Sequence, residues 1–166
     1  MGMTLPSELV SVLGVLGYDW PQSDEEHLMN FGQSWMNFSG DLGNVGAEAA
    51  AASASASAWA DQVGQDIDAF KTWWEGEDSP RKVIEDGAIG AMIAGVGLMI
   101  CAIIVLCLKI MVIVQLIILA VQIAIAIAEA AVTFGASLLQ IPIFQQLART
   151  VVGNLIQEAV FKLLEA

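Results

Sequence analysis

Few residues in this chain have side chains that could do chemistry, and their spacing forms no catalytic set. His27 is the only histidine, so a site built from several histidine ligands is excluded. Cys101 and Cys107 are six residues apart, point in different directions on a helix, and are interpreted as buried free thiols. No nucleophile, base and orienting group occur together. We therefore expect no enzyme activity, no catalytic residue, no cofactor and no bound metal.

Gln115, Gln122 and Glu129 are polar residues at heptad spacing within an apolar stretch, so they share one face of a helix. One interpretation is that neighbouring groups satisfy them at the rim of a soluble bundle. The alternative is a polar stripe that faces a water-filled lumen or a partner within an apolar assembly. A buried carboxylate is costly unless it is paired or hydrated, so Glu129 separates the two interpretations most sharply.

The stretch that carries this stripe is apolar enough to cross a membrane. Between residues 87 and 128 the only charged residue is Lys109, and the part on each side has about the 20 residues that a transmembrane helix needs. No Gly, Pro or Asn marks a loop between the two parts. We expect a long, strongly hydrophobic helix pair here. Its small residues Gly87, Gly90 and Gly95 predict close helix packing.

The charge of the chain is divided unevenly. Residues 1–86 hold fifteen of the eighteen acidic and three of the six basic residues, so they carry the whole net charge of −12. This excludes nucleic acid as a partner and argues against docking on anionic lipid by charge alone. We expect an acidic region at 1–78 and a hydrophobic region at 79–166 that packs on it or inserts into a membrane, the two forming one cooperative unit.

The acidic region reads as a helical hairpin that follows a short helix over residues 4–16, which Gly17 ends. Ser23 and Glu26 form a capping box at the start of the first arm, and Trp20 is expected to pack across that start. A seam at three- and four-residue spacing follows, which predicts packing on a partner helix. Its residues are Leu28, Phe31, Trp35, Phe38, Leu42 and Val45.

The second arm of this hairpin is expected to turn near Gly64 and to end at Gly76. Its seam residues are Trp59, Val63, Ile67, Phe70 and Trp74. Ser79 and Pro80 then predict the cap and first turn of the next helix, and Pro142 predicts the start of a C-terminal amphipathic helix. The predicted fold is therefore all-α: an elongated helical bundle made of the acidic hairpin, the hydrophobic helix pair and the C-terminal helix.

The opening stretch resembles a known family. Pro6, Gly17, Trp20-Pro21, Asp24-Glu25 and Trp35 are similar to the start of the Trp-x-Gly-like N-terminal domain of actinobacterial polymorphic toxins, which are exported by type VII secretion. The similarity continues to the last helix. It departs at Gln62, which stands where the family has the Trp before Gly64. The chain also lacks a Tyr-x-x-x-Asp/Glu export signal, because Gln22 follows Tyr18 at the fourth position.

The resemblance implies a non-enzymatic trafficking and delivery domain for a toxin cargo that lies outside this chain. Its partner is expected to be another helical protein or a second copy. A related mycobacterial toxin has an N-terminal channel domain, so the alternative is an oligomeric pore that inserts residues 87–134 into membrane lipid. A resident membrane protein of unrelated function is a third alternative. No secretory signal is recognised, so we expect export without a cleaved leader, or membrane association.

Overall fold

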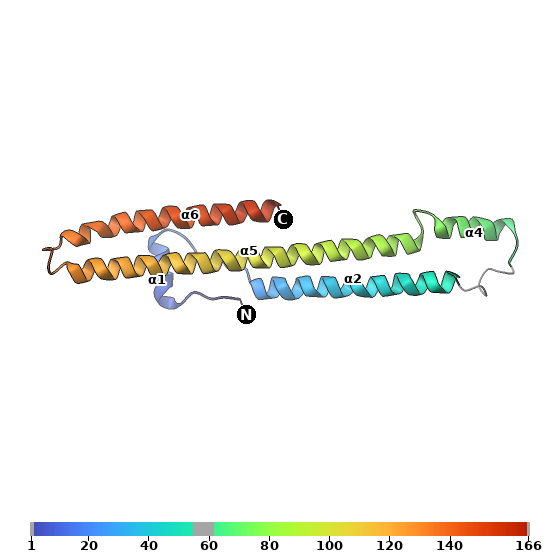
Figure 1. Ribbon diagram of the computed structural model, residues 1–166, viewed down its shortest axis with the longest axis horizontal. Coiled ribbons are helices and arrows are strands. Elements are labelled where there is room, and N and C mark those ends of the chain that lie inside the picture. Colours follow the sequence, from blue (N-terminus) through green and yellow to red (C-terminus); the bar gives the residue numbers. More distant parts are fainter. Residues whose placement is uncertain (1, 55–61, 166) are drawn as a thin grey trace. The chain divides into compact units, whose positions relative to one another are not determined.

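The computed structural model describes residues 2–54 and 62–165, and its regular elements in these ranges are all helical. The all-α prediction is therefore confirmed for this part of the chain, whereas Trp59 lies outside the described residues. Figure 1 labels the elements. They are α1 (Ser7–Val15), α2 (Glu25–Ala54), α4 (Gln65–Glu75), α5 (Pro80–Glu129), the 3-10 helix η1 (Ala136–Gln140) and α6 (Ile141–Glu165).

The chain divides into two compact units at points that differ from the expected boundary at residue 78. Unit 1 comprises Met1–Leu28 and Ile100–Ala166, and unit 2 comprises Met29–Met99. Helix α5 contributes its first part to unit 2 and its last part to unit 1. The two apolar stretches expected to form a helix pair are thus parts of one continuous helix, as the missing loop signal between them requires.

Unit 2 is built on the antiparallel contact between α2 and the first part of α5 (Figure 1). Gly32 lies against Gly95, and the Ser39 hydroxyl donates a 2.7 Å hydrogen bond to the carbonyl oxygen of Ala88. The partner of α2 is therefore α5. The expected second arm, which was to run back from Gly64, is only the short α4, and Val63 precedes that helix with 96% of its surface exposed.

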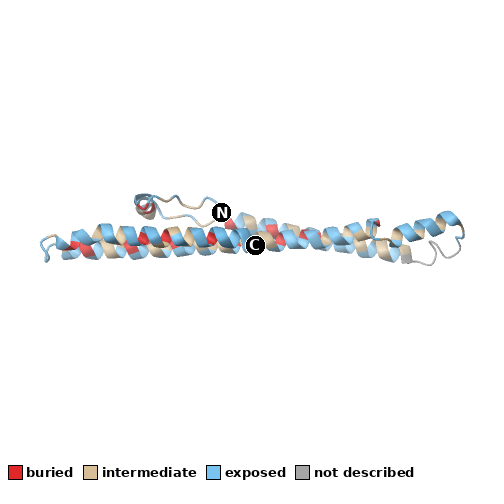
Figure 2. Cartoon of the chain, turned by 90° about the horizontal axis from the view of Figure 1, so that it is seen from above, coloured by how far each residue is buried: buried red, intermediate tan, exposed pale blue. Residues whose placement is uncertain are grey.

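Unit 1 has a core of aliphatic residues where α1 lies against α5 and α6. Leu13 and Leu16 of α1 and the turn that follows it are 2% and 1% exposed, and they pack with Leu116 of α5 and Val152 of α6, which are both fully buried. Trp20 is half-buried against the same core. In Figure 2 the buried residues form narrow lines along the helices, and most of the remaining surface is exposed. Each helix therefore buries only one stripe.

Several helix boundaries agree with the sequence and one does not. Gly17 has φ +77 after α1, Ser79 Oγ accepts a 3.2 Å hydrogen bond from Lys82 N at the start of α5, and Pro142 lies in the first turn of α6. The cap of α2 is Asp24, whose carboxylate accepts a 3.0 Å bond from His27 N. The predicted Ser23 capping box is wrong by one residue, because the helix begins at Glu25.

Candidate interaction surfaces

Gly32 and Gly95 bring the backbones of α2 and α5 unusually close in unit 2. A Cβ at either glycine would lie 2.8 Å from the carbonyl oxygen of the other, closer than real Cβ atoms approach such atoms. A Cβ at Gly87 would make an ordinary 3.8 Å contact with Leu42 Cδ1, and one at Gly90 would meet nothing within 4 Å. Of the three glycines predicted for close helix packing, only Gly95 therefore forces a close approach within the unit.

The α2 stripe that faces α5 is made of small and half-buried residues. Gly32 and Ser39 are buried, and Trp35 and Leu42 are half-buried. Phe31 and Phe38 belong to the predicted seam but lie beside this stripe, 52% and 49% exposed. The seam predicted from hydrophobicity is therefore offset from the one that packs internally, because close backbone contact selects the smallest side chains.

Phe31, Trp35 and Phe38 form an aromatic ladder along α2, in which the half-buried Trp35 lies between two exposed rings. Edge-to-face contacts join the rings, with centroids 6.4 Å apart for Phe31–Trp35 and 6.1 Å apart for Trp35–Phe38. Together with Ser34 they line a shallow groove of about 220 Å³. Large aromatic side chains that are already held by one another lose little entropy on binding, so this ladder suits a helical partner.

A second aromatic group lies on α4. Phe70 and Trp74 stack with an interplanar angle of 15° and centroids 6.1 Å apart, and Trp73 lies beside both. Trp73 is 49% exposed and was not singled out by the spacing rule. Phe70 and Trp74 also line a cavity of about 510 Å³ that includes Ala50 of α2 and Arg81 of α5. Phe70 and Trp74 therefore face the end of α2 and the start of α5 across this cavity.

The predicted polar stripe lies on the last part of α5. Gln115 and Gln122 are half-buried, and Glu129, the last residue of the helix, is exposed. Thr133 Oγ1 donates a 2.9 Å hydrogen bond to the backbone carbonyl of Glu129. The stripe is therefore half-buried at Gln115 and Gln122 and exposed at Glu129. Its role as the lining of a lumen stays a prediction.

The spacing rules missed a buried ion pair in unit 1. Lys109, only 2% exposed, places its Nζ 2.6 Å from the Glu25 carboxylate and 2.6 Å from the carbonyl oxygen of Ser23. The same Nζ donates a 3.3 Å bond to the carbonyl of Met3 and lies 5.8 Å from the centre of the Trp20 ring. The indole N–H of Trp20 also donates to Met3 O, at 3.3 Å. Lys109, the only charged residue between positions 87 and 128, is therefore surrounded by residues in and just after the Trp-Pro stretch, together with Met3.

The electrostatics of this pair favour the charged form of Glu25. Burial by itself raises the pKa of Glu25, but hydrogen bonds from Lys109 and from the backbone N–H of Met3 outweigh it and hold that pKa below its ordinary value. The bond from His27 N likewise lowers the pKa of the neighbouring Asp24. The signal that sequence reasoning overlooked was Lys109 itself, because a lone charge in a long apolar run requires a partner carboxylate.

Metal chemistry finds no support in the part of the chain that the structure describes, where no three His, Cys, Asp or Glu side chains are grouped to hold an ion. Cys101 and Cys107 are both free thiols, but the interpretation of both as buried is wrong, because Cys101 is half-buried and Cys107 is exposed. The helical stretch Gln65–Glu129 contains a window of mean hydropathy 3.0, of which 33% is buried. By length and composition alone such a helix crosses a membrane or forms the core of a soluble protein.

Comparison with protein families places the chain in one of them. A family model described as a WXG100 like domain matches residues 5–151, which is most of the chain. The chain therefore belongs to this family, which is related to type VII secretion. No curated protein and no solved structure matches it. Membership indicates a secretion-associated helical domain and is consistent with packing against a helical partner or a second copy.

Proposed function

We propose that this chain is a non-enzymatic trafficking and delivery domain of a toxin that is exported by type VII secretion. The observation that carries the proposal is the family match over residues 5–151. The arrangement in unit 2 supports it, because two antiparallel helices there present a side of α2 that is not used internally.

The aromatic ladder is the surface on which a helical partner would pack. Phe31 and Phe38 are about half exposed, yet Trp35 holds both through edge-to-face contacts. Partial exposure leaves apolar area to bury, and the ring contacts fix the positions of the side chains before binding. A partner that supplies an apolar helix would bury this area, and the acidic residues of the surrounding surface would keep the free chain in solution.

Export is the direct test of this proposal. The chain would be produced in a bacterium that has an active type VII secretion system and in an otherwise identical strain that lacks the motor ATPase of that system. We expect the protein in the culture filtrate of the first strain only, with a cytoplasmic marker absent from both filtrates. Equal amounts in both filtrates, or retention of the protein in the cells of both strains, would contradict the proposal.

A second candidate function is an oligomeric pore, which the outer surface of α5 in unit 1 favours. Ile110, Val114, Ile117, Val121 and Ile125 are 45–52% exposed on this helix. A run of exposed aliphatic side chains gains by transfer to lipid or to another copy of the chain. Gln115, Gln122 and Glu129 would then face one another or water, since a carboxylate that faces lipid costs about 2.5–3.5 kcal/mol.

Conductance across a planar bilayer tests the pore. We expect currents from the wild type, and we expect the triple variant Gln115→Leu/Gln122→Leu/Glu129→Leu to abolish them or to change their ion selectivity. Circular dichroism of both proteins checks that the helices persist. Absence of current from folded wild-type protein, over a range of pH and lipid composition, leaves export and partner packing as the function.

A further inference from the structure

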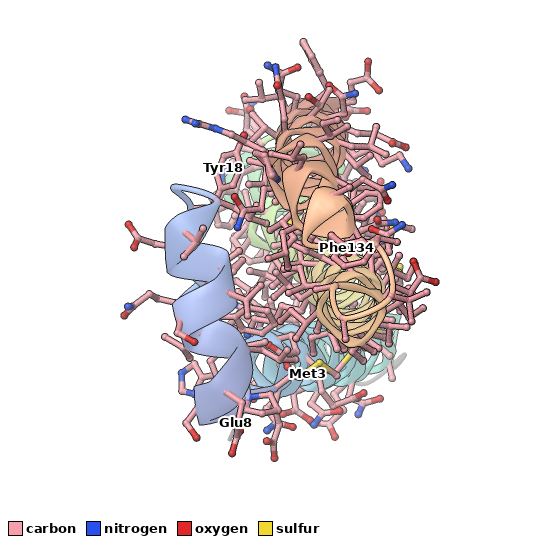
Figure 3. The ribbon with its side chains drawn as sticks, turned by 90° about the vertical axis from the view of Figure 1, so that its left-hand side faces the viewer. Met3, Glu8, Tyr18 and Phe134 are labelled. Carbon is pink, nitrogen blue, oxygen red and sulfur yellow. The ribbon has the colours of Figure 1, made fainter. Side chains whose placement is uncertain are left out.

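The turn that joins α5 to η1 presents an aromatic side chain directly to solvent. Phe134 is 100% exposed and has φ +51, the left-handed region that bulky residues rarely adopt. Figure 3 labels Phe134 at this turn, on the side of the molecule that faces the viewer. A fully exposed Phe in a strained conformation contributes no packing to the fold. Such residues are often kept for a function, and the surroundings of the side chain indicate which ligand it suits.

The polar groups of this turn are used inside it. Thr133 Oγ1 donates to Glu129 O, Ser137 Oγ donates a 2.7 Å bond to the carbonyl of Ala126, and Ser137 N donates to Thr133 Oγ1 at 3.3 Å. The backbone N–H of Gly135 donates a 2.8 Å bond to the carbonyl of Ala130. Ser137 is only 3% exposed. The turn thus buries the hydroxyl of Ser137 and bonds that of Thr133 internally, while its apolar side chains are exposed.

The residues around Phe134 are apolar, exposed and uncharged. Val132 is 81%, Leu139 75% and Ile143 64% exposed. No Asp, Glu, Lys or Arg occurs in residues 130–148. This surface, formed by Val132, Phe134, Leu139 and Ile143, is called the apolar tip below. Side chains exposed to this degree lie in no groove of their own, so a partner would have to surround them on several sides.

We propose that the apolar tip docks unit 1 on a lipid bilayer, with Phe134 entering the acyl region first. A bilayer surrounds a protruding side chain from all sides and offers no hydrogen-bond partners. The turn lowers the cost of entry because the hydroxyls of Thr133 and Ser137 and the backbone N–H of Gly135 are already hydrogen-bonded within unit 1. The absence of charge matches a zwitterionic surface, since the chain as a whole carries −12 and is repelled by anionic lipid. The inference rests on the membrane alternative proposed above and specifies its first contact.

Flotation with vesicles tests the tip with a matched control. The full chain would be mixed with phosphatidylcholine vesicles, and the bound fraction compared among wild type, Phe134→Ser and Phe161→Ser. Phe161 is a Phe of the same unit, 66% exposed near the far end of α6. Because both side chains are exposed, neither substitution disturbs the fold. We expect Phe134→Ser to weaken binding about tenfold, the loss that follows from one Phe no longer entering lipid, and Phe161→Ser to leave it unchanged.

Depth of insertion gives an independent readout. With Cys101 and Cys107 replaced by Ala, an environment-sensitive dye attached at Phe134→Cys is expected to shift its emission to the blue on adding vesicles, and the same dye at Phe161→Cys is not. Absence of wild-type binding, an equal loss in both Ser variants, or binding only to vesicles with anionic lipid overturns the proposal. Docking without bilayer current overturns the pore and leaves the tip standing, so the two failures are distinguishable.

Discussion

The two units of this chain pack helices against α5 in opposite ways. In unit 2 the contact depends on missing side chains, because Gly32 and Gly95 let two backbones approach. In unit 1 it depends on large ones, because Leu13 and Leu16 fill the space over Leu116 and Val152, and a buried ion pair lies beside them. The same helix therefore makes a close backbone contact where its stripe has glycine, and packs through large aliphatic side chains where its stripe has leucine and valine.

The type of packing in each unit determines which large apolar side chains remain exposed. A stripe of glycine and serine leaves the aromatic residues of α2 free, as at Phe31 and Phe38, whereas the aliphatic stripe of unit 1 consumes its large residues internally. Unit 2 is therefore suited to recognition along a helix. Unit 1 buries an aliphatic core of its own, and its exposed apolar surface includes the outer side of α5 and the apolar tip.

The largest expected effect concerns the ion pair of unit 1. Glu25→Gln or Lys109→Met leaves one buried group of the pair without its partner, which typically costs about 3–5 kcal/mol of unfolding free energy. The measurement is hydrogen exchange of the amides of α1 and of the last part of α5. The double variant Glu25→Gln/Lys109→Met leaves no buried charge, so we expect it to recover much of the lost protection.

Lys162→Met serves as the control for this pair, because Lys162 forms a comparable 2.7 Å pair with Glu158 on the surface of α6. Screening makes such exposed pairs weak, so exchange should hardly change. Equal effects of Lys109→Met and Lys162→Met would show that burial of the first pair has no energetic consequence.

The next effect concerns the close crossing of unit 2. Gly32→Ala or Gly95→Ala places a Cβ against a carbonyl oxygen, so the helices must separate, at a cost of about 1–3 kcal/mol. Gly43→Ala and Gly90→Ala are matched controls, since nothing lies within 4 Å of either Cβ position. Alanine should stabilise these helical positions by about 0.5–1 kcal/mol. Thermal unfolding compares the four, and stabilisation by Gly95→Ala would contradict the close crossing.

A smaller effect is expected at the start of α5. Ser79 is fully buried, and its hydroxyl accepts a hydrogen bond from Lys82 N, so Ser79→Ala should cost about 1 kcal/mol. Ser34→Ala is the control, because its hydroxyl is exposed and bonds only to the carbonyl of Asn30 in its own helix. Chemical denaturation monitored by circular dichroism measures both, and an equal shift would exclude a capping role for Ser79.

The smallest effect concerns the pH dependence of stability that Glu25 causes. We expect it only at acidic pH and not near neutrality. The pKa of Glu25 is held below its ordinary value of 4.5 in the folded chain. Its contribution to stability is therefore fully present above that value and is lost as the pH falls through the lower, folded pKa. We expect exchange of the α1 amides to show no opening between neutral pH and 5 once the intrinsic pH dependence is removed. Opening within that range would contradict the depressed pKa.

Local signals predicted much of the fold. Ser79-Pro80, Gly17 and Pro142 mark helix ends in the structure because capping and backbone geometry involve only near neighbours. Pairing was not predictable in the same way. The aromatic seam of α2 was the strongest hydrophobic pattern, yet the internal contact uses the neighbouring stripe that contains Gly32, since hydrophobicity does not record how closely two backbones approach.

Contacts between distant residues were also beyond the sequence patterns. Glu25 and Lys109 are 84 positions apart, and no periodicity links them. Phe134 and Ser137 lie in the turn after α5, for which no hydrophobic periodicity or motif predicted a surface. Which of these side chains turns outward depends on the internal hydrogen bonds of Thr133 and Ser137, which only the folded turn shows.

Export of two matched variants tests most directly whether unit 2 carries the recognition surface of this secretion domain. In a strain with an active type VII system, Phe31→Ala/Phe38→Ala should remain folded and be exported at least about tenfold less than wild type, because the aromatic ladder is truncated. Leu147→Ala/Leu164→Ala truncates two exposed residues of α6 that lie outside the apolar tip and should be exported normally. Normal export of the first variant, or equal loss of both, would contradict the account.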